Sequence, residues 1–391
     1  MKATGYRVVL IISADFTDAE AVAELRRISF ALHWTKAAYW RKSPLRTRLG
    51  RRFPFLRRLL WESIKPLLRE LRGNARAEVT SPIEEPGNSD HVHGFFVSDK
   101  LLKTVGKLAR RYKPHAVIVE YVFATPLFAS FAQDTLKIVD TIDVFSLKKD
   151  QVLAFGITTD FLTCSPEAER RYLLMADTAV AIQLREAELL REIVPERNVI
   201  LAGVDFDVVD DSFANGAIPF RIAVVASDNP LNVHGLRGFL EECWPAIKRS
   251  CPAVSLHVVG RVGDLCRIED ASIQYSNWVA DLTPVYREAS VVINPAIAGT
   301  GLKIKSVEAL AHGKPLVAWP HGVDGLEYEG TAPFIECRSW REFGDAIIRL
   351  LISDAERNAL SNRALAYARA EFEASAVYTN LRKHLGEPQR S

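Results

Sequence analysis

Residues 291–325, VVINPAIAGTGLKIKSVEALAHGKPLVAWPHGVDG, decide how this chain folds. An apolar run that ends at Asn294 predicts a β-strand, and the small residues at 298–301 predict a loop. A helical pattern follows as far as Gly313, and a second apolar run at 315–319 predicts another strand. Together they form a βαβ unit with its loop at the carboxyl end of a strand, where open α/β sheets bind ligands.

This loop has the features of a phosphate-binding loop. An anion is favoured here for two reasons. No side chain covers the backbone amides at Gly299 and Gly301, and the positive end of the dipole of the following helix points at the loop. We expect the charge of Lys305 to attract the phosphate. We expect the phosphate to be oriented by three backbone amides, those of Leu302, Lys303 and Ile304. Glu308 lies one to two turns further on and is better suited to accept hydrogen bonds from a ribose diol. The loop therefore predicts a nucleoside diphosphate site; the alternative is a turn whose glycines only let strand and helix pack.

Two better-known phosphate motifs are excluded. Position 304 is isoleucine, so the third glycine of the dinucleotide fingerprint is absent. Lys314 is followed by Pro315, which does not fit a P-loop.

Length and composition indicate a globular protein of two domains. The chain has 391 residues, of which 48% are hydrophobic and 25% charged. Its five cysteines are scattered without a C-x-x-C pair, which favours a reducing compartment and argues against structural zinc. The start of the chain reads as a first strand rather than a signal peptide, and no apolar run approaches the roughly 20 residues needed to cross a bilayer. We expect a cytoplasmic protein.

Short apolar runs alternate with helical patterns along the chain, which is typical of doubly wound parallel sheets. The predicted strands are 7–12, 115–120, 136–142, 178–182, 221–225, 255–259, 290–293 and 315–318. An acidic stretch that ends in proline, 206–219, has the composition of a linker. We therefore expect two Rossmann-like domains that face one another across a cleft, residues 1–205 and 220–370, and a C-terminal helix, 371–391, that returns toward the first domain.

The ordered set of motifs from about residue 105 to 385 resembles the GT-B glycosyltransferases of family 4, also called group 1. The similarity is densest over 220–326. Its pieces are DTAVAI at 177–182 with Glu186, Val204-Asp205, NPLN at 229–232 with Gly235, LHVVG at 256–260, Trp278-Val279, Tyr286, Glu308-Ala309-Leu310, GKPLV at 313–317 and Gly325-Leu326.

The resemblance implies roles for several residues on the second domain. Glu308 matches the family's ribose-binding glutamate, and Thr300 stands where many members have a glutamate that contacts the donor sugar. Trp278 and Val279 match the loop that borders the base. His234 stands where a lysine is usual, and the usual upstream arginine falls near Asn229. Two cations expected at the leaving diphosphate are therefore absent, and we infer that Lys303 or Lys305 replaces them.

In the first domain, DTIDVF at 140–145 is similar to a family segment whose histidine is here Ile142. One hypothesis is that Asp143 orients the acceptor or the transferring sugar. The alternative is that Asp140 and Asp143 only cap the turn after a strand.

Residues 34–76 form a basic stretch rich in aromatic residues. Between Lys36 and Arg76 there are thirteen Lys or Arg and two acidic residues, Glu62 and Glu70. One interpretation is a helix that packs its leucine stripe on the domain core; another is an amphipathic surface that binds anionic lipid. Nucleic acid is disfavoured because no recognition motif accompanies the charge.

The sequence thus predicts a retaining glycosyltransferase that uses a nucleoside-diphosphate sugar and needs no cofactor or divalent metal. The acceptor is expected to be a lipid-linked or glycan intermediate of a bacterial envelope polysaccharide or glycolipid, with the enzyme peripheral on the inner face of the membrane. A non-catalytic relative that binds a nucleotide sugar or a partner is the alternative, because Thr300 and Ile142 depart from the family pattern. An isomerase or phosphorylase of the same fold is disfavoured, since no lysine is placed to carry pyridoxal.

Overall fold

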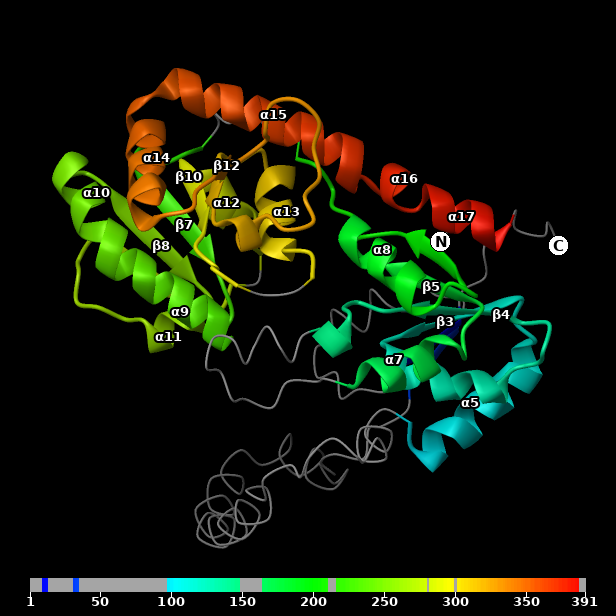
Figure 1. Cartoon of the computed structure of the whole chain (residues 1–391). Helices are drawn as coiled ribbons and strands as arrows, with labels where there is room; N and C mark the ends of the chain where they lie inside the picture. The colour runs from blue at the N-terminus through cyan, green and yellow to red at the C-terminus, as the bar shows by residue number, and fades with distance from the viewer. Residues whose placement is uncertain are drawn as a thin grey trace, which may run out of the picture. The chain divides into compact units, whose positions relative to one another are not determined.

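The computed structural model describes residues 97–147, 164–209, 216–279, 281–298 and 301–386, and the backbone of two short strands (Figure 1). The predictions for Gly299, Thr300 and the basic stretch 34–76, apart from the backbone of Trp34, lie outside these residues. The chain divides into two compact units, residues 1–112 with 388–391, and residues 113–387.

In the first unit, the described residues form two strands and one helix. Strand β1 (Val9–Ile12) pairs in parallel with β2 (Ala31–Trp34), with Val9 opposite Ala31. Helix α5 (Asp99–Tyr112) buries Leu101 and Val105.

The second unit begins with a parallel sheet of four strands in the order β3-β4-β5-β6. Its strands are β3 (Ala116–Glu120), β4 (Leu136–Asp140), β5 (Thr178–Ala181) and β6 (Asn198–Leu201). The segments between them are the 3₁₀ helix η2 (Val122–Ser130) and the helices α7 (Pro166–Leu173) and α8 (Leu184–Ile193). Because all four strands are parallel, their carboxyl ends lie at one edge of the sheet.

The second sheet is also parallel, in the order β12-β11-β10-β7-β8-β9. Its strands are β7 (Arg221–Val225), β8 (Ser255–Val259), β9 (Ile273–Ser276), β10 (Val291–Asn294), β11 (Leu316–Ala318) and β12 (Ile335–Glu336). The chain adds β8 and β9 on one side of β7 and then returns to place β10 on the other. The strand order therefore reverses between β7 and β10, and such a switch point is where open α/β sheets bind ligands.

Helices cover both faces of this second sheet. On one face the buried core joins Ile222 and Leu256 of the sheet to the helices α9 (Pro230–Gly238), α10 (Trp244–Ser250) and α14 (Trp340–Ile352) and to η3 (Phe239–Cys243), one turn of π-helix. On the other face a second core joins the sheet to α12 (Thr283–Glu288), α13 (Ile304–Ala311) and α15 (Asp354–Phe372). The part of the unit around this sheet also contains two short elements, α11 (Val262–Leu265) and the 3₁₀ turn η4 (Pro320–Gly322).

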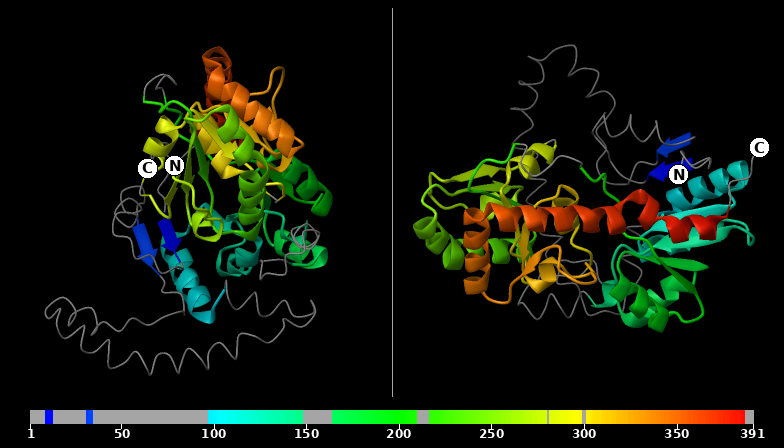
Figure 2. Two further views of the ribbon diagram at one scale, coloured as in Figure 1. Left: turned by 90° about the vertical axis from the view of Figure 1, so that its left-hand side faces the viewer. Right: turned by 90° about the horizontal axis from the view of Figure 1, so that it is seen from above.

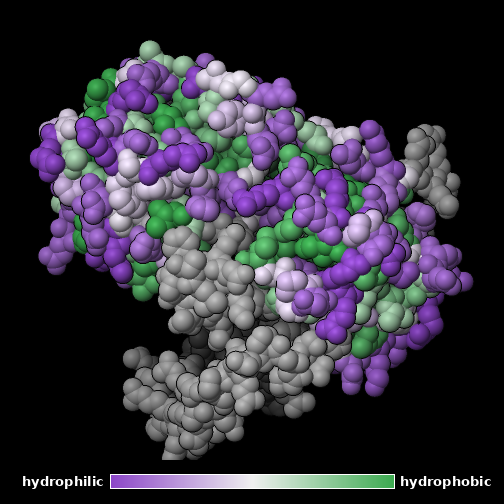
Figure 3. All heavy atoms as spheres, in the orientation of Figure 1, coloured by the Kyte–Doolittle hydropathy of each residue, from purple (hydrophilic) through white to green (hydrophobic). Residues whose placement is uncertain are grey.

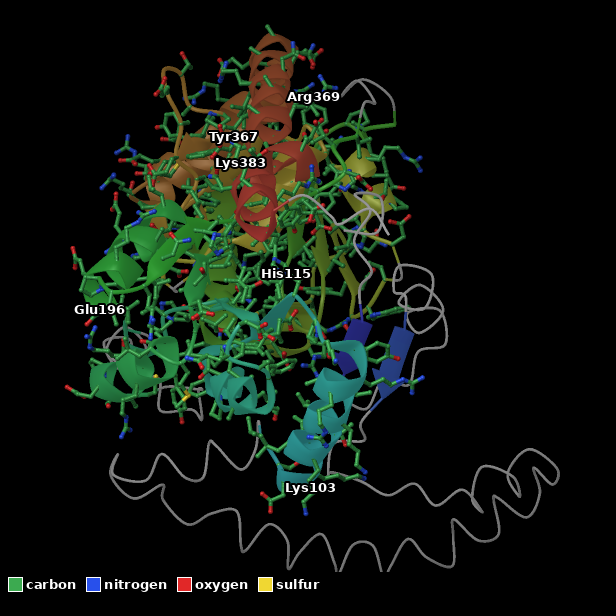
Figure 4. The ribbon with its side chains drawn as sticks, turned by 90° about the vertical axis from the view of Figure 1, so that its right-hand side faces the viewer. Lys103, His115, Glu196, Tyr367, Arg369 and Lys383 are labelled. Carbon is green, nitrogen blue, oxygen red and sulfur yellow. The ribbon has the colours of Figure 1, made fainter. Side chains whose placement is uncertain are left out.

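The C-terminal helices run on from α15 through α16 (Ala374–Val377) to α17 (Thr379–Leu385), as Figure 2 shows in orange and red. Tyr367, labelled in Figure 4, lies on α15. Its ring packs edge-on against that of Phe372, with 5.6 Å between ring centroids. Further along, Tyr378 donates a hydrogen bond to Asp205 (2.6 Å), and His384 lies 2.8 Å from the Thr178 hydroxyl. The end of the chain therefore contacts the first sheet of this unit.

The two parallel sheets confirm the predicted α/β class with two Rossmann-like folds. The boundaries predicted at 205, 219 and 370 stay a prediction. Hydrophilic residues predominate on the face of the molecule in Figure 3, with small hydrophobic patches between them. Among the described residues, none of the helices has both the length and the apolarity to span a membrane.

Candidate functional site

A buried hydrogen-bond network fixes the end of β10 at the switch point. The Asn294 side chain donates to the Ser306 hydroxyl (2.8 Å) and to the Gly322 carbonyl (3.0 Å), and Ser306 donates to the same carbonyl (2.6 Å). Asn294 Oδ1 in turn accepts from the Ala296 amide (3.3 Å). Strand β10, the first turn of α13 and η4 are thereby tied together, which holds the two ends of the predicted donor loop.

The helix that follows the loop starts slightly later than the sequence suggests. Gly301 has φ +72°, a left-handed conformation that favours glycine, and α13 begins at Ile304 with Lys303 as its N-cap. The Ile304 amide donates to the Leu302 carbonyl (3.0 Å), and the Leu302 side chain is buried in the core. The Ile304 amide is thus already used by the turn at Leu302, and its contact with a ligand stays a prediction.

The two lysines reach in different directions. Lys303 Nζ folds back onto the Gly301 carbonyl (2.8 Å), while Lys305 Nζ donates to Asn232 Oδ1 on α9 (2.6 Å). Burial, and next the charge of Lys303, lower the pKa of Lys305 to about 7. Lys305 thus links the two helices that flank the switch point, and near neutral pH it gains or loses its charge easily.

Glu308 is held by a buried tyrosine. Its carboxylate accepts a hydrogen bond from the Tyr286 hydroxyl (2.9 Å), and burial raises the pKa of Glu308 while this bond opposes the rise. Tyr286 is fully buried on α12 and stacks on His312, with 4.8 Å between ring centroids. Glu308 is half-buried, so a fixed carboxylate remains within reach of a ligand.

Three further predicted residues lie on other elements of this half. His234 is exposed on α9 next to Gly235, where an added Cβ would stand 2.2 Å from the Pro295 carbonyl oxygen. The side chain of Trp278 is 79% exposed, and Val279 is partly buried against the core. Their contact with a base stays a prediction.

A cavity of about 340 Å³ lies beside α9. Its lining residues are Asp228, Pro230, Leu231, Val233, His234, Arg237 and Leu265. Among the described residues that we predicted for the donor, only His234 lines it. The cavity therefore adjoins the predicted diphosphate site without containing residues 301–308.

Asp143, in the first sheet's half of the unit, lies beside the donor loop. It is buried after β4, in a turn where Ile142 has φ +62°, and Glu169 holds this turn by accepting the amides of Phe145 (2.8 Å) and Ser146 (3.0 Å). An ideal Cβ on Gly301 would stand 4.0 Å from Asp143 Oδ1 and 4.0 Å from Glu186 Oε1. The structure therefore brings Asp143 together with the loop that precedes α13.

Several residues of this site were not assigned a role from the sequence. Asn232, Tyr286 and Glu186 belong to the motifs that resemble the family, but spacing alone does not say which lysine or glutamate each one contacts. Gln183 and Glu169 carried no signal, because a polar residue early in a helix is usually solvated or a cap.

The fold is that of GT-B glycosyltransferases. The crystal structure of TarM superimposes with a TM-score of 0.57 at 12% identity, over 73% of this chain and 58% of TarM. HepE from Anabaena, in complex with UDP-glucose, gives 0.55 at 16% identity, over 73% of this chain and 81% of HepE. The pneumococcal O-GlcNAc transferase GtfA, in complex with UDP and GlcNAc, gives 0.54 at 14% identity, over 73% of this chain and 60% of GtfA.

The sequence adds a domain assignment to the fold. Residues 219–353 match the family model of glycosyl transferases group 1, and this stretch contains the loop, α13 and Glu308. This match confirms the resemblance predicted from the motifs. The chain spans only about three-fifths of the length of TarM and GtfA. No curated protein matches the sequence.

Proposed function

We propose that this protein is a retaining glycosyltransferase that moves a sugar from a nucleoside-diphosphate donor to an acceptor hydroxyl. The observation that carries the proposal is the placement of Glu308 at the switch point, fixed by Tyr286 within the group 1 domain. The structures of HepE and GtfA with UDP support a nucleotide donor.

In this proposal each charge of the donor has a partner. Lys305 and Lys303 neutralise the diphosphate together with the start of α13, and Glu308 accepts the ribose hydroxyls. Trp278 and Val279 border the base, and His234 lies near the diphosphate. Asp143 orients the acceptor or the transferring sugar. The bond from the anomeric carbon of the sugar to the diphosphate oxygen breaks, and the acceptor oxygen bonds to the same carbon on the same face. The proton of the acceptor hydroxyl leaves on the departing diphosphate.

No divalent metal is required if lysine charge, backbone amides and the helix dipole stabilise the departing diphosphate. The acceptor is a lipid-linked or glycan intermediate of a bacterial envelope, and the basic stretch 34–76 holds the protein on the inner, anionic face of the membrane. Flotation with anionic liposomes tests that last step. The absence of salt-sensitive binding would reject it.

A second candidate is a non-catalytic protein that binds a nucleotide sugar or a partner. It is favoured by Ile142, which takes the strained position at φ +62° where the family segment has a histidine. Release of nucleoside diphosphate from a nucleotide sugar by the purified protein separates the two candidates, since a binding protein leaves the sugar bond intact.

The variant Glu308→Ala tests the site. It removes an acceptor of charge-assisted hydrogen bonds, each of which contributes about 1.5–3 kcal/mol, so we expect UDP to bind about 10- to 100-fold more weakly. Titration calorimetry with UDP measures this, with the exposed Glu329→Ala as a matched control. Equal UDP affinity in Glu308→Ala and wild type would reject the ribose assignment.

A further inference from the structure

The first turn of α8 places two polar side chains at the carboxyl edge of the first sheet. Gln183 and Glu186 follow β5, and Asp143 follows the neighbouring strand β4. Gln183 is 4% exposed and Glu186 is 5% exposed. Such burial is unusual for a glutamate, and among the described residues no cationic side chain forms an ion pair with Glu186.

These side chains face the donor loop. The space beside the Gly301 Cα is open among the described residues, since an ideal Cβ there meets only Asp143 Oδ1 and Glu186 Oε1, both at 4.0 Å. Lys303, which follows Gly301 in the loop, is close enough to act electrostatically on Glu186. A group the size of a carbon atom therefore fits between the loop and the two carboxylates.

The hydrogen-bonding capacity of this cluster is only partly used. Gln183 Nε2 donates to Glu186 Oε1 (3.2 Å). Within the described part of the chain, Glu186 Oε2 and Gln183 Oε1 have no hydrogen-bond partner. Both atoms are acceptors. Gln183 Oε1 packs against Gly325, where an ideal Cβ would stand 1.8 Å from it, so the Glu186 carboxylate is the group that selects a ligand that donates. A sugar offers hydroxyl groups as donors, whereas the acceptor oxygens of a phosphate would be repelled.

We propose that the Glu186 carboxylate, whose Oε1 faces the space beside Gly301, binds a hydroxyl group of the transferred sugar, with Gln183 fixing its orientation. This inference rests on the proposed function and deepens it, because it assigns recognition of the sugar to a side chain of the first sheet. The diphosphate is left to α13.

The charges around Glu186 define the expected pH dependence. Burial, and next the charge of Asp143, raise the pKa of Glu186 to about 7, with Asp324 adding to the rise. Gln183 and Lys303 oppose it, and Arg185 lies 3.9 Å from Asp324. As pH falls through 7 the carboxylate becomes protonated and loses a charge-assisted hydrogen bond. Use of the sugar donor should therefore decline on the acid side.

The test compares a nucleotide sugar with its nucleotide. For Glu186→Gln we expect kcat/KM for UDP-glucose hydrolysis or transfer to fall at least tenfold, while the Kd for UDP stays within twofold of wild type. The acid limb of the pH profile near 7 should disappear in this variant. Glu188→Gln, on the exposed side of the same helix, is the matched control and should behave as wild type. GDP-mannose and GDP serve as a second pair of probes.

Two outcomes would overturn the inference. In one, Glu186→Gln retains wild-type kcat/KM and the same acid limb; in the other, UDP binding falls as much as use of UDP-glucose. Glu186→Ala, measured beside Glu186→Gln, should lose at least as much activity; if it fails to fold, the isosteric variant decides. Wild-type protein that neither binds UDP nor cleaves UDP-glucose, with the GDP pair equally inert, would reject the proposed function itself.

Discussion

At the scale of single residues, sequence spacing identified candidate site residues, but it did not identify the residues that they contact. The sequence placed Lys305 and Glu308 three residues apart in one helical pattern, yet Lys305 bonds to Asn232 on α9 and Glu308 bonds to Tyr286 on α12. The helical period gives a direction around one axis, but the partner of each side chain depends on which elements the fold places beside α13. Glu186 escaped assignment for the same reason, because burial is a property of the assembled fold.

The lowered pKa of Lys305 predicts how nucleotide binding responds to pH. Burial lowers the pKa of Lys305 to about 7, and a diphosphate binds the ammonium form of this side chain. Above pH 7, UDP affinity should therefore fall by up to tenfold per pH unit, and UDP binding should be accompanied by proton uptake. The window from about pH 7 to 9 isolates this group, since the terminal phosphate ionises near pH 6. Calorimetry in two buffers of different ionisation enthalpy measures the uptake.

Two variants sharpen that experiment. Lys305→Met should weaken UDP binding and flatten its pH dependence between pH 7 and 9. Asn232→Asp places a carboxylate where the amide oxygen now lies 2.6 Å from Nζ, which should raise the pKa of Lys305 and preserve affinity at higher pH. A wild-type affinity that does not change over this window would mean that Lys305 does not bind the diphosphate.

At the scale of elements, the central strands of the two larger sheets were predicted, and the strands that were missed there are edge strands, although the edge strand β3 was predicted. The predicted strands at 221–225, 255–259 and 290–293 correspond to β7, β8 and β10 in the middle of the second sheet. The missed strands β9 and β12 lie at its two edges, and β6 lies at an edge of the first sheet. An edge strand has one neighbour and is partly solvated, so its sequence lacks the continuous apolar run that identifies a central strand.

The close approach of α9 to the loop after β10 predicts the effect of one methyl group. In Gly235→Ala the new Cβ would stand 2.2 Å from the Pro295 carbonyl oxygen, so α9 must move away from the donor loop. We expect a loss of about 1–3 kcal/mol in the free energy of unfolding, together with weaker UDP binding. Denaturant unfolding and calorimetry measure the two effects.

Gly344→Ala is the matched control for that variant. Gly344 is also helical, and its Cβ would meet Cys243 at an ordinary distance of 3.8 Å. Alanine should be neutral or stabilising there, by up to about 1 kcal/mol. If both variants unfold alike and bind UDP alike, the approach of α9 to Pro295 does not govern the site.

At the scale of the whole molecule, the ordered motifs predicted the GT-B class. Strands that alternate with helices form parallel sheets, and the helices cover the faces of those sheets. The sequence was less informative about what joins the sheets within residues 113–387. The helical composition of the tail predicted a return, but the contacts of Tyr378 with Asp205 and of His384 with Thr178 depend on where α15 points after it crosses the second core.

These tail contacts predict which part of the molecule loosens when they are removed. The double variant Tyr378→Phe/His384→Ala deletes two hydrogen bonds worth roughly 0.5–1.5 kcal/mol each, and less where they are exposed. Because Thr178 lies in β5, amide hydrogen exchange should quicken in α17 and at the β5 end of the first sheet, while β7 and β8 keep their protection. Lys383→Ala, an exposed change on the same helix (Figure 4), should leave exchange as in wild type. Uniformly faster exchange across both sheets would instead mean that the tail stabilises the unit as one cooperative whole. Unchanged exchange would mean that the two hydrogen bonds do not stabilise the packing of the tail on the first sheet.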